Sequence, residues 1–269
     1  PQDKVEQYNI EIVPLQLIFE DRTYRDGIDI SASEFYARLR QSPKPPTTSS
    51  SSPKLYFDAY RKAAQRAESI LCLTEPSKFS AMFNSASIAK EMARTSMPNV
   101  MIEVLDCTTA AAGQGLVALA AAKAAASGKN LKEVKETAEN VMDRVNLFAT
   151  LDTLHYLVKS GRVPQAAALV NSLLKIKPIF TLNHADARTV ALPRSIKSAM
   201  QRILKLMERN IIKGEPIHAA VMHADSLDNA VILKNRIASQ FNCCELFITE
   251  FTPVMGVHTG PGLLGVAFY

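Results

Sequence analysis

Two hydroxyl-rich segments stand where helices are expected to begin. One covers residues 48–52 directly before Pro53, and the other covers residues 77–80, with Ser80 at the start of the next helix. Backbone N–H groups and the helix dipole at such positions favour a carboxylate or a phosphate. A single Ser or Thr there is more often an ordinary cap, but two such segments in one half of the chain indicate an anion site. The candidate side chains are the hydroxyl groups of residues 48–52 and of Ser77 and Ser80.

The second half of the chain supplies two candidate partners for such an anion. Arg162 lies between Gly161 and Pro164, which predict the end of one helix and the start of the next. A guanidinium binds carboxylates and phosphates well, although a lone arginine is more often a surface ion-pair residue. His258 lies in the glycine-rich stretch 256–262 and is expected at a strand end, with a structural role as open as a functional one.

The other chemistry-bearing residues form no convincing catalytic or metal site. His218 and His223 would face opposite sides of a strand, and Asp225 with Asp228 fits the start of a helix. The sequence has no GxSxG elbow, Walker motif or dinucleotide fingerprint, and its 4 cysteines lack CxxC spacing. The pattern therefore favours a binding protein with no catalytic residue, no metal and no cofactor.

Composition and charge narrow the class of protein further. The 269 residues are 47% hydrophobic with a formal net charge of +5, which is typical of a folded globular chain. No apolar run reaches the length of a membrane span, and the polar N-terminus does not resemble a signal peptide. We therefore expect a soluble cytoplasmic protein. The absence of Trp and of an aromatic-basic ladder argues against nucleic acid as a partner, while the positive charge could assist transient contact with an anionic membrane surface.

Alternating strand and helix patterns predict an α/β fold with a parallel sheet covered by helices. In the first half, strands are expected at 9–19, 69–73 and 100–105, with helices at 53–67, 80–94, 114–127 and 130–143. In the second half, strands are expected at 146–150, 178–182, 217–222, 245–249, 254–258 and 266–269, with helices at 153–159, 164–174, 195–212 and 227–240. A domain boundary near residue 145 would give domains 1–145 and 146–269.

Several motifs, taken in order, resemble the bacterial DegV family of fatty-acid-binding proteins. They extend over essentially the whole chain, which makes the combination specific. The motifs are Val13-Pro14-Leu15, Tyr24-Arg25-Asp26-Gly27, Asp29-Ile30-Ser31, Pro46 to Pro53, Ser77-Lys78-Phe79-Ser80, Leu154 to Val163, Lys177-Pro178-Ile179 and His258-Thr259-Gly260-Pro261-Gly262.

The resemblance implies a two-domain DegV-like fold, with an N-terminal parallel sheet flanked by helices and a C-terminal α/β domain with a mixed sheet. It implies a long-chain fatty acid between the domains, with its carboxylate bound by Thr48 with Ser49, Ser80, Arg162 and His258. It also implies a non-catalytic carrier that presents this carboxylate to a separate fatty acid kinase. An enzyme of dihydroxyacetone-kinase type, acting on a small anion in the same cleft, is the alternative.

The chain departs from the usual family pattern at several places. The family's usual first strand, which ends in a Thr-Asp-Ser segment, does not stand before Pro1 in this sequence, so either that segment is absent from the protein or the sequence begins after it. Ser51 replaces the usual proline, and Ala81 and Met82 replace a glycine and a threonine beside Ser80. These changes predict an altered head-group site. Apolar side chains of the 79–92 and 166–174 helices are candidates for either acyl contacts or plain core.

Overall fold

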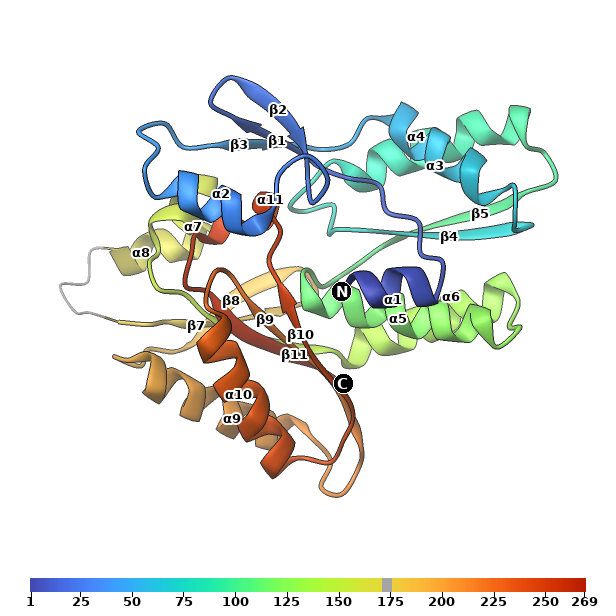
Figure 1. The fold of residues 1–269 in the computed structure, drawn as a ribbon. Helices are drawn as coiled ribbons and strands as arrows, with labels where there is room; N and C mark the ends of the chain where they lie inside the picture. The colour runs from blue at the N-terminus through green and yellow to red at the C-terminus, as the bar shows by residue number, and fades with distance from the viewer. Residues whose placement is uncertain (171–175) are drawn as a thin grey trace.

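The structure is a computed structural model that describes residues 1–170 and 176–269. The helices and strands of its first half contain two separate sheets (Figure 1). The elements are α1 (Gln2–Gln7), β1 (Gln16–Phe19), β2 (Arg22–Arg25), α2 (Ala32–Leu39), β3 (Thr47–Ser49), α3 (Pro53–Ala63), β4 (Ser69–Thr74), α4 (Met82–Ser96), β5 (Met101–Asp106), α5 (Ala112–Ala126) and α6 (Leu131–Arg144).

The second half contributes every strand of a third, six-stranded sheet in the order β10-β9-β11-β6-β7-β8. Its elements are β6 (Asn146–Thr150), α7 (His155–Ser160), the 3₁₀ turn η1 (Pro164–Ala166), α8 (Ala167–Val170), β7 (Ile179–Asn183), β8 (Asp186–Ala191), α9 (Ile196–Asn210), β9 (Ile217–His223), α10 (Leu227–Gln240), β10 (Cys243–Glu250), α11 (Pro253–Thr259) and β11 (Leu264–Phe268).

The mixed α/β fold class is confirmed, with one refinement in the first half. β4 and β5 pair in parallel, as expected, and lie between α3 with α4 on one face and α5 with α6 on the other (Figure 1). The strands β2, β1 and β3 form a separate antiparallel sheet that sequence patterns did not predict. In the second half the sheet is mixed, because β10 and β9 are parallel while β11, β6, β7 and β8 are antiparallel to their neighbours.

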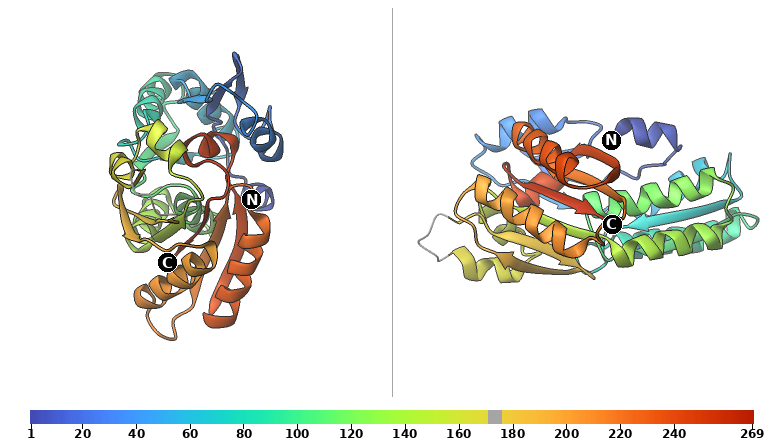
Figure 2. Two further views of the ribbon diagram at one scale, coloured as in Figure 1. Left: turned by 90° about the vertical axis from the view of Figure 1, so that its left-hand side faces the viewer. Right: turned by 90° about the horizontal axis from the view of Figure 1, so that it is seen from below.

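The six-stranded sheet is covered on both faces. α9 and α10 pack on one face (Figure 2). They bury an apolar cluster that includes Ile203, Leu233 and Val266. The other face carries Leu147, Ala149 and Met222, which belong to a cluster shared with α2, α5 and α11. The sheet therefore meets the N-terminal half through this second face. Among the described helices, none is both long and apolar enough to cross a membrane.

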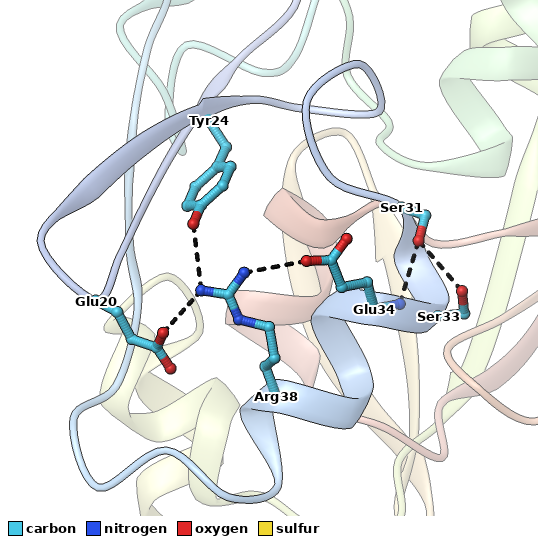
Figure 3. A network of polar contacts seen from close by, with 6 residues as sticks. All are labelled: Glu20, Tyr24, Ser31, Ser33, Glu34 and Arg38. Carbon is cyan, nitrogen blue, oxygen red and sulfur yellow. Dashed lines mark hydrogen bonds and ion pairs between the residues drawn. The ribbon is translucent and has the colours of Figure 1, made fainter.

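Helix α2 is tied to the β1–β2 hairpin by a polar network (Figure 3). The Ser31 hydroxyl accepts a hydrogen bond from the Glu34 backbone N–H at 3.2 Å and so caps the start of α2. The Arg38 guanidinium donates to Glu34 at 3.2 Å, to Glu20 at 2.7 Å and to the Tyr24 hydroxyl at 3.2 Å. These contacts are mostly exposed and add modest stability, and they join α2 to the β1–β2 hairpin.

Residues 254–258 form part of a helix, so the expected strand there is wrong. Pro253 occupies the first helical position, and the Val254 N–H donates to Asp26 Oδ1 at 3.0 Å. Proline has no N–H that needs a partner, and the Asp26 carboxylate accepts a hydrogen bond at the start of the helix. Together they stabilise a short helix where the local sequence predicts a strand. His258 consequently lies in the last turn of α11 and not at a strand end.

Other expected elements differ from the structure in their extent. Of residues 9–19 only Gln16–Phe19 is a strand, and β8 was not predicted. The helix expected at 164–174 begins as the 3₁₀ turn η1 and continues as α8, and its remainder lies outside the described residues. The expected 146–150 strand and 227–240 helix match β6 and α10.

Close packing of α11 on α2 makes Gly256 a sensitive position. A Cβ atom there would lie 2.7 Å from Phe35 Cε1 and 2.8 Å from Tyr36 Oη, both on the buried face of α2. We expect Gly256→Ala to lower the free energy of unfolding by about 1–3 kcal/mol through overpacking. Urea denaturation measures this change. Gly115→Ala is the matched control, because its Cβ would meet nothing within 4 Å, and helix propensity predicts a gain of about 0.5–1 kcal/mol. Equal effects of the two variants would contradict the packing assignment.

Candidate functional site

A cavity of about 490 Å³ lies between the six-stranded sheet, on the face that carries Leu147, Ala149 and Met222, and the loops of the N-terminal half. Its volume is within the usual range for small-molecule sites. The walls are mostly apolar and include Leu147, Ala149, Phe180, Leu182, Met222 and Val254. The hydroxyl-bearing segments and α11 provide most of the polar lining. The chemistry of this surface suits a ligand that is largely hydrocarbon and carries a polar group.

All five residues selected from the sequence line this one cavity. They come from four separate parts of the fold: β3, the loop before α4, the turn after α7, and α11. The residues are Thr48, Ser49, Ser80, Arg162 and His258. The structure therefore brings the candidates together, while their assignment to a fatty-acid carboxylate stays a prediction.

Thr48 and His258 make direct contact across 210 positions of sequence. The Thr48 hydroxyl lies 3.2 Å from His258 Nε2. Burial, together with the positive charge of Arg162, lowers the pKa of His258 to about 4, so its ring is neutral at pH 7 and carries a single N–H. Its Nδ1 is buried without a partner among the described residues, where a proton would be an unsatisfied donor. The tautomer that donates from Nε2 to Thr48 is therefore favoured, and it leaves the Thr48 proton free for a ligand oxygen.

The second hydroxyl segment leads into the uncapped start of α4. Ala81 occupies the N-cap and makes no side-chain cap hydrogen bond, and Ser80, Ala81 and Met82 all line the cavity. The first backbone N–H groups of a helix lack internal partners, and α4 is 15 residues long. The replacement of a glycine by Ala81 thus still leaves a helix start that faces the cavity, beside the Ser80 hydroxyl.

Arg162 lies at the exposed rim of the cavity. Gly161 adopts φ +68° at the C-cap of α7 and Pro164 begins η1, as the sequence predicted. The guanidinium donates to the carbonyl of Ser160 at 2.6 Å, which holds the side chain back along its own turn. Its charge still contributes to lowering the pKa of His258. Arg162 is therefore placed to attract an anion toward the cavity without being buried itself.

Ser51, which replaces the usual family proline, has a structural role. Its hydroxyl donates to the carbonyl of Pro14 at 2.7 Å, and the residue is fully buried. This contact attaches the 50–52 loop to the segment that leads into β1. The contact therefore helps to hold β3, which carries Thr48 and Ser49, in place beside β1.

Glu75 is a cavity-lining residue that the sequence analysis missed. It directly follows β4, is partly buried and lines the cavity. Burial raises the pKa of Glu75 to about 7, although a hydrogen bond from the Ala111 backbone opposes the shift. Ala111 itself has φ +52°, an unusual backbone conformation for a residue with a side chain. The only sequence signal was an acidic residue at the carboxyl end of an apolar strand.

Glu75 and His258 impose opposite pH dependences on stability. Between its ordinary pKa of 4.5 and about 7, Glu75 holds a proton in the folded state that it loses on unfolding, so stability falls as pH rises. Between about 4 and its ordinary 6.5, His258 gains a proton on unfolding, so stability rises with pH. Each effect amounts to at most about 3 kcal/mol, and the two largely cancel where their windows overlap.

Substitution of Glu75 should reveal this compensation. We expect the free energy of unfolding of Glu75→Gln to exceed that of the parent protein by an amount that grows from pH 4.5 to 7 and then stays constant. Relative to His258→Gln, the parent protein should be less stable at acid pH, and this difference should disappear by pH 6.5. Urea denaturation across this range measures both differences. A Glu75→Gln difference that does not vary with pH would contradict a buried, protonated Glu75.

Most of the apolar wall comes from elements that were not singled out from the sequence. Phe79 and Met82 line the cavity, as the 79–92 segment allowed, but Ile88 and Met92 are 43% and 45% exposed. The wall is supplied mainly by β6, β7 and β9 and by α11. Cavity-facing and core-facing side chains alternate along such strands, so the sequence alone does not distinguish them. Residues 171–175 of the second candidate segment lie outside the described part.

Comparison with known proteins identifies the family. A family model described as an uncharacterised protein of the DegV family matches residues 1–269. A DegV domain-containing protein of Clostridium perfringens is 30% identical over 268 residues, which cover 100% of this chain and 94% of that protein. The chain belongs to the DegV family.

Solved structures agree with this assignment. A DegV family protein from Thermus thermophilus, described as fatty acid binding, is 28% identical with a TM-score of 0.92, and the match covers 100% of this chain and 95% of that one. DegV of Bacillus subtilis, described as a fatty acid binding protein, is 28% identical with a TM-score of 0.89, and covers 100% and 94% respectively. The arrangement of both halves of the chain is thus that of the family.

Proposed function

We propose that this protein binds a long-chain fatty acid, with the acyl chain in the cavity and the carboxylate at Thr48, Ser49, Ser80, Arg162 and His258. The observation that carries this proposal is the combination of an apolar wall with hydroxyl groups and a neutral histidine in one cavity. The description of the Thermus thermophilus and Bacillus subtilis relatives as fatty acid binding supports it.

The energetics of the cavity favour such a ligand. Each buried methylene contributes about 0.8 kcal/mol, so a long acyl chain gains on the order of 10 kcal/mol before the costs of association. A carboxylate left without partners would cost several kcal/mol and cancel much of that gain. The Thr48 proton, the Ser80 hydroxyl and the free N–H groups of α4 supply the donors that the carboxylate needs.

In this proposal the protein performs no catalysis and needs no metal or cofactor. It acts as a carrier that presents the carboxylate to a separate fatty acid kinase, which forms the acyl phosphate. The exposed Arg162 at the rim of the cavity marks the side from which the kinase would reach the carboxylate. Transient contact with an anionic membrane surface, assisted by the net charge of +5, would allow exchange of the fatty acid.

We further propose residues 1–145 and 146–269 as the two domains that hold the ligand between them. The six-stranded sheet begins at Asn146, and the cavity is lined from both sides of this point. The cytoplasm is the proposed location. The cysteines are all free thiols, which is typical of proteins in a reducing compartment.

Extraction of the purified protein tests the ligand. Denaturing extraction and mass spectrometry of protein from a bacterial host should yield fatty acid in amounts comparable to the protein. Repeated absence of lipid, together with no binding of added fatty acid, would overturn the proposal.

ATP turnover tests the role as a carrier. The chain alone should hydrolyse no ATP and form no acyl phosphate, whereas addition of a fatty acid kinase should produce acyl phosphate. Turnover by the chain alone would favour the kinase-type enzyme instead.

A further inference from the structure

Three side chains on the neighbouring strands β9 and β10 form a hydrogen-bonded series away from the cavity. Cys244 Sγ lies 3.3 Å from His218 Nε2, and His218 Nδ1 lies 3.1 Å from Glu245 Oε2. The Cys244 thiol also lies 3.3 Å from the carbonyl of Ile217. A thiol, an imidazole and a carboxylate in this order are the parts of an activated nucleophile, in which the base accepts the thiol proton and the third group orients the base.

The imidazole is held in place on several sides. Its ring stacks on Tyr269 with centroids 4.8 Å apart and an interplanar angle of 11°. Glu245 accepts a hydrogen bond from Lys123 at 2.7 Å as well as contacting His218. Burial would raise the pKa of Glu245, but the hydrogen bonds from Lys123 and His218 outweigh it and hold the pKa below its usual value. A charged Glu245 stabilises the imidazolium that forms when His218 accepts the thiol proton.

The surroundings of Cys244 determine what it can react with. Cys244 is exposed on β10, the edge strand of the six-stranded sheet, whereas Cys243 packs against the apolar cluster under α9 and α10. The pairing of β10 with β9 is irregular between Cys243 and Glu245. Cys243 is packed on this cluster while Cys244 is exposed, so Cys243 is not placed to resolve an oxidised Cys244. Formation of a disulfide at this thiol therefore requires an external sulfur.

The charges around the series favour an anionic reagent. Lys123 and Lys4 contact Glu245 at 2.7 and 3.7 Å, and the Arg144 guanidinium lies 5.4 Å from the centre of the Tyr269 ring. Among the described side chains that contact Glu245, His218 or Tyr269, three cationic groups thus face one side-chain carboxylate. Such an excess attracts anions from solution at low ionic strength.

We propose that Cys244 is a thiol–disulfide exchange site for anionic low-molecular-weight disulfides, with His218 as its base and Glu245 as a positioning residue. His218 Nε2 takes the thiol proton, and the Cys244 thiolate attacks one sulfur of the disulfide. A Cys244–sulfur bond forms as the disulfide bond of the reagent breaks, and the departing thiolate takes the proton from His218. The reagent is the oxidant, and the products are a mixed disulfide and one free small thiol.

Rates of modification by glutathione disulfide at pH 7, followed by intact and peptide mass spectrometry, test this proposal. We expect Cys244 in the folded protein to react about tenfold faster than the same residue in the urea-unfolded chain, and His218→Gln to remove this advantage. Glu245→Gln should displace the pH profile of the reaction to higher pH. Cys244→Ser should prevent modification at this position while leaving fatty-acid binding unchanged, because none of these residues lines the cavity.

A comparison of an anionic with a cationic disulfide tests the charge preference of the site independently. Glutathione disulfide should react faster than the cationic disulfide cystamine, and Lys123→Gln should reduce the ratio of the two rates while Cys244 and His218 remain in place. Equal rates for the folded parent protein and His218→Gln would overturn the role of His218. A preference for cystamine would overturn the assignment of an anionic reagent. Neither result bears on the proposed binding of fatty acid.

Discussion

Replacing Ala149 by tryptophan is expected to weaken binding of a long-chain fatty acid at least about 100-fold. Ala149 lies on β6, is 6% exposed, and lines the cavity together with Leu147 of the same strand and Leu151 directly after it. The indole would occupy space in the 490 Å³ cavity that the acyl chain needs. Exclusion of about four methylenes costs about 3 kcal/mol, which corresponds to roughly two orders of magnitude in the dissociation constant.

The dependence of affinity on the length of the fatty acid distinguishes a shortened cavity from a general loss of binding. If tryptophan shortens the cavity, the preference should move from long acids toward shorter ones, as measured by displacement of a fluorescent fatty acid. Ala126→Trp on the exposed end of α5 is the matched control, and its affinity should equal that of the parent protein. Circular dichroism and the thermal midpoint report whether each variant is folded. A folded Ala149→Trp protein with unchanged affinity for long acids would place the acyl chain elsewhere.

Three of the polar residues that line the cavity carry a local signal in the sequence. Thr48 and Ser80 stand near helix starts, and Arg162 is placed by a glycine that ends one helix and a proline that begins the next. These signals depend on backbone conformation over a few residues, which sequence patterns describe well. Their convergence on one cavity depends on how the sheets pack, and the family resemblance, not any local pattern, predicted it.

Features that depend on distant partners were not predictable. α11 reads locally as a strand, and its first turn is completed by Asp26, which lies 228 positions away. Glu75 owes its raised pKa to burial in a cavity whose walls come from both halves of the chain. The contact of Cys244 with His218 follows from the register of β10 on β9, which pairs Glu245 with His218. In each case the deciding interaction joins segments that no local pattern connects.

Thr48→Val should weaken binding of a long-chain fatty acid by about 10–100-fold while leaving the fold intact. Valine has nearly the shape of threonine but lacks the hydroxyl that contacts His258 and, in our proposal, donates to the carboxylate. A hydrogen bond to a charged group contributes about 1.5–3 kcal/mol. Thr47→Val is the matched control, since Thr47 is the neighbouring residue of β3 and is exposed. Displacement titrations of both variants measure the effect.

The methyl ester of the same fatty acid separates recognition of the head group from loss of packing. The ester has the same acyl chain but no charge, so Thr48→Val should cost it much less affinity than it costs the acid. Ser80→Ala should show the same difference, because its hydroxyl stands at the uncapped start of α4. Arg162→Ala should affect the acid more at low salt than at high salt, because its exposed charge is screened. If Thr48→Val weakens acid and ester equally, Thr48 shapes the cavity and the carboxylate is bound by other groups.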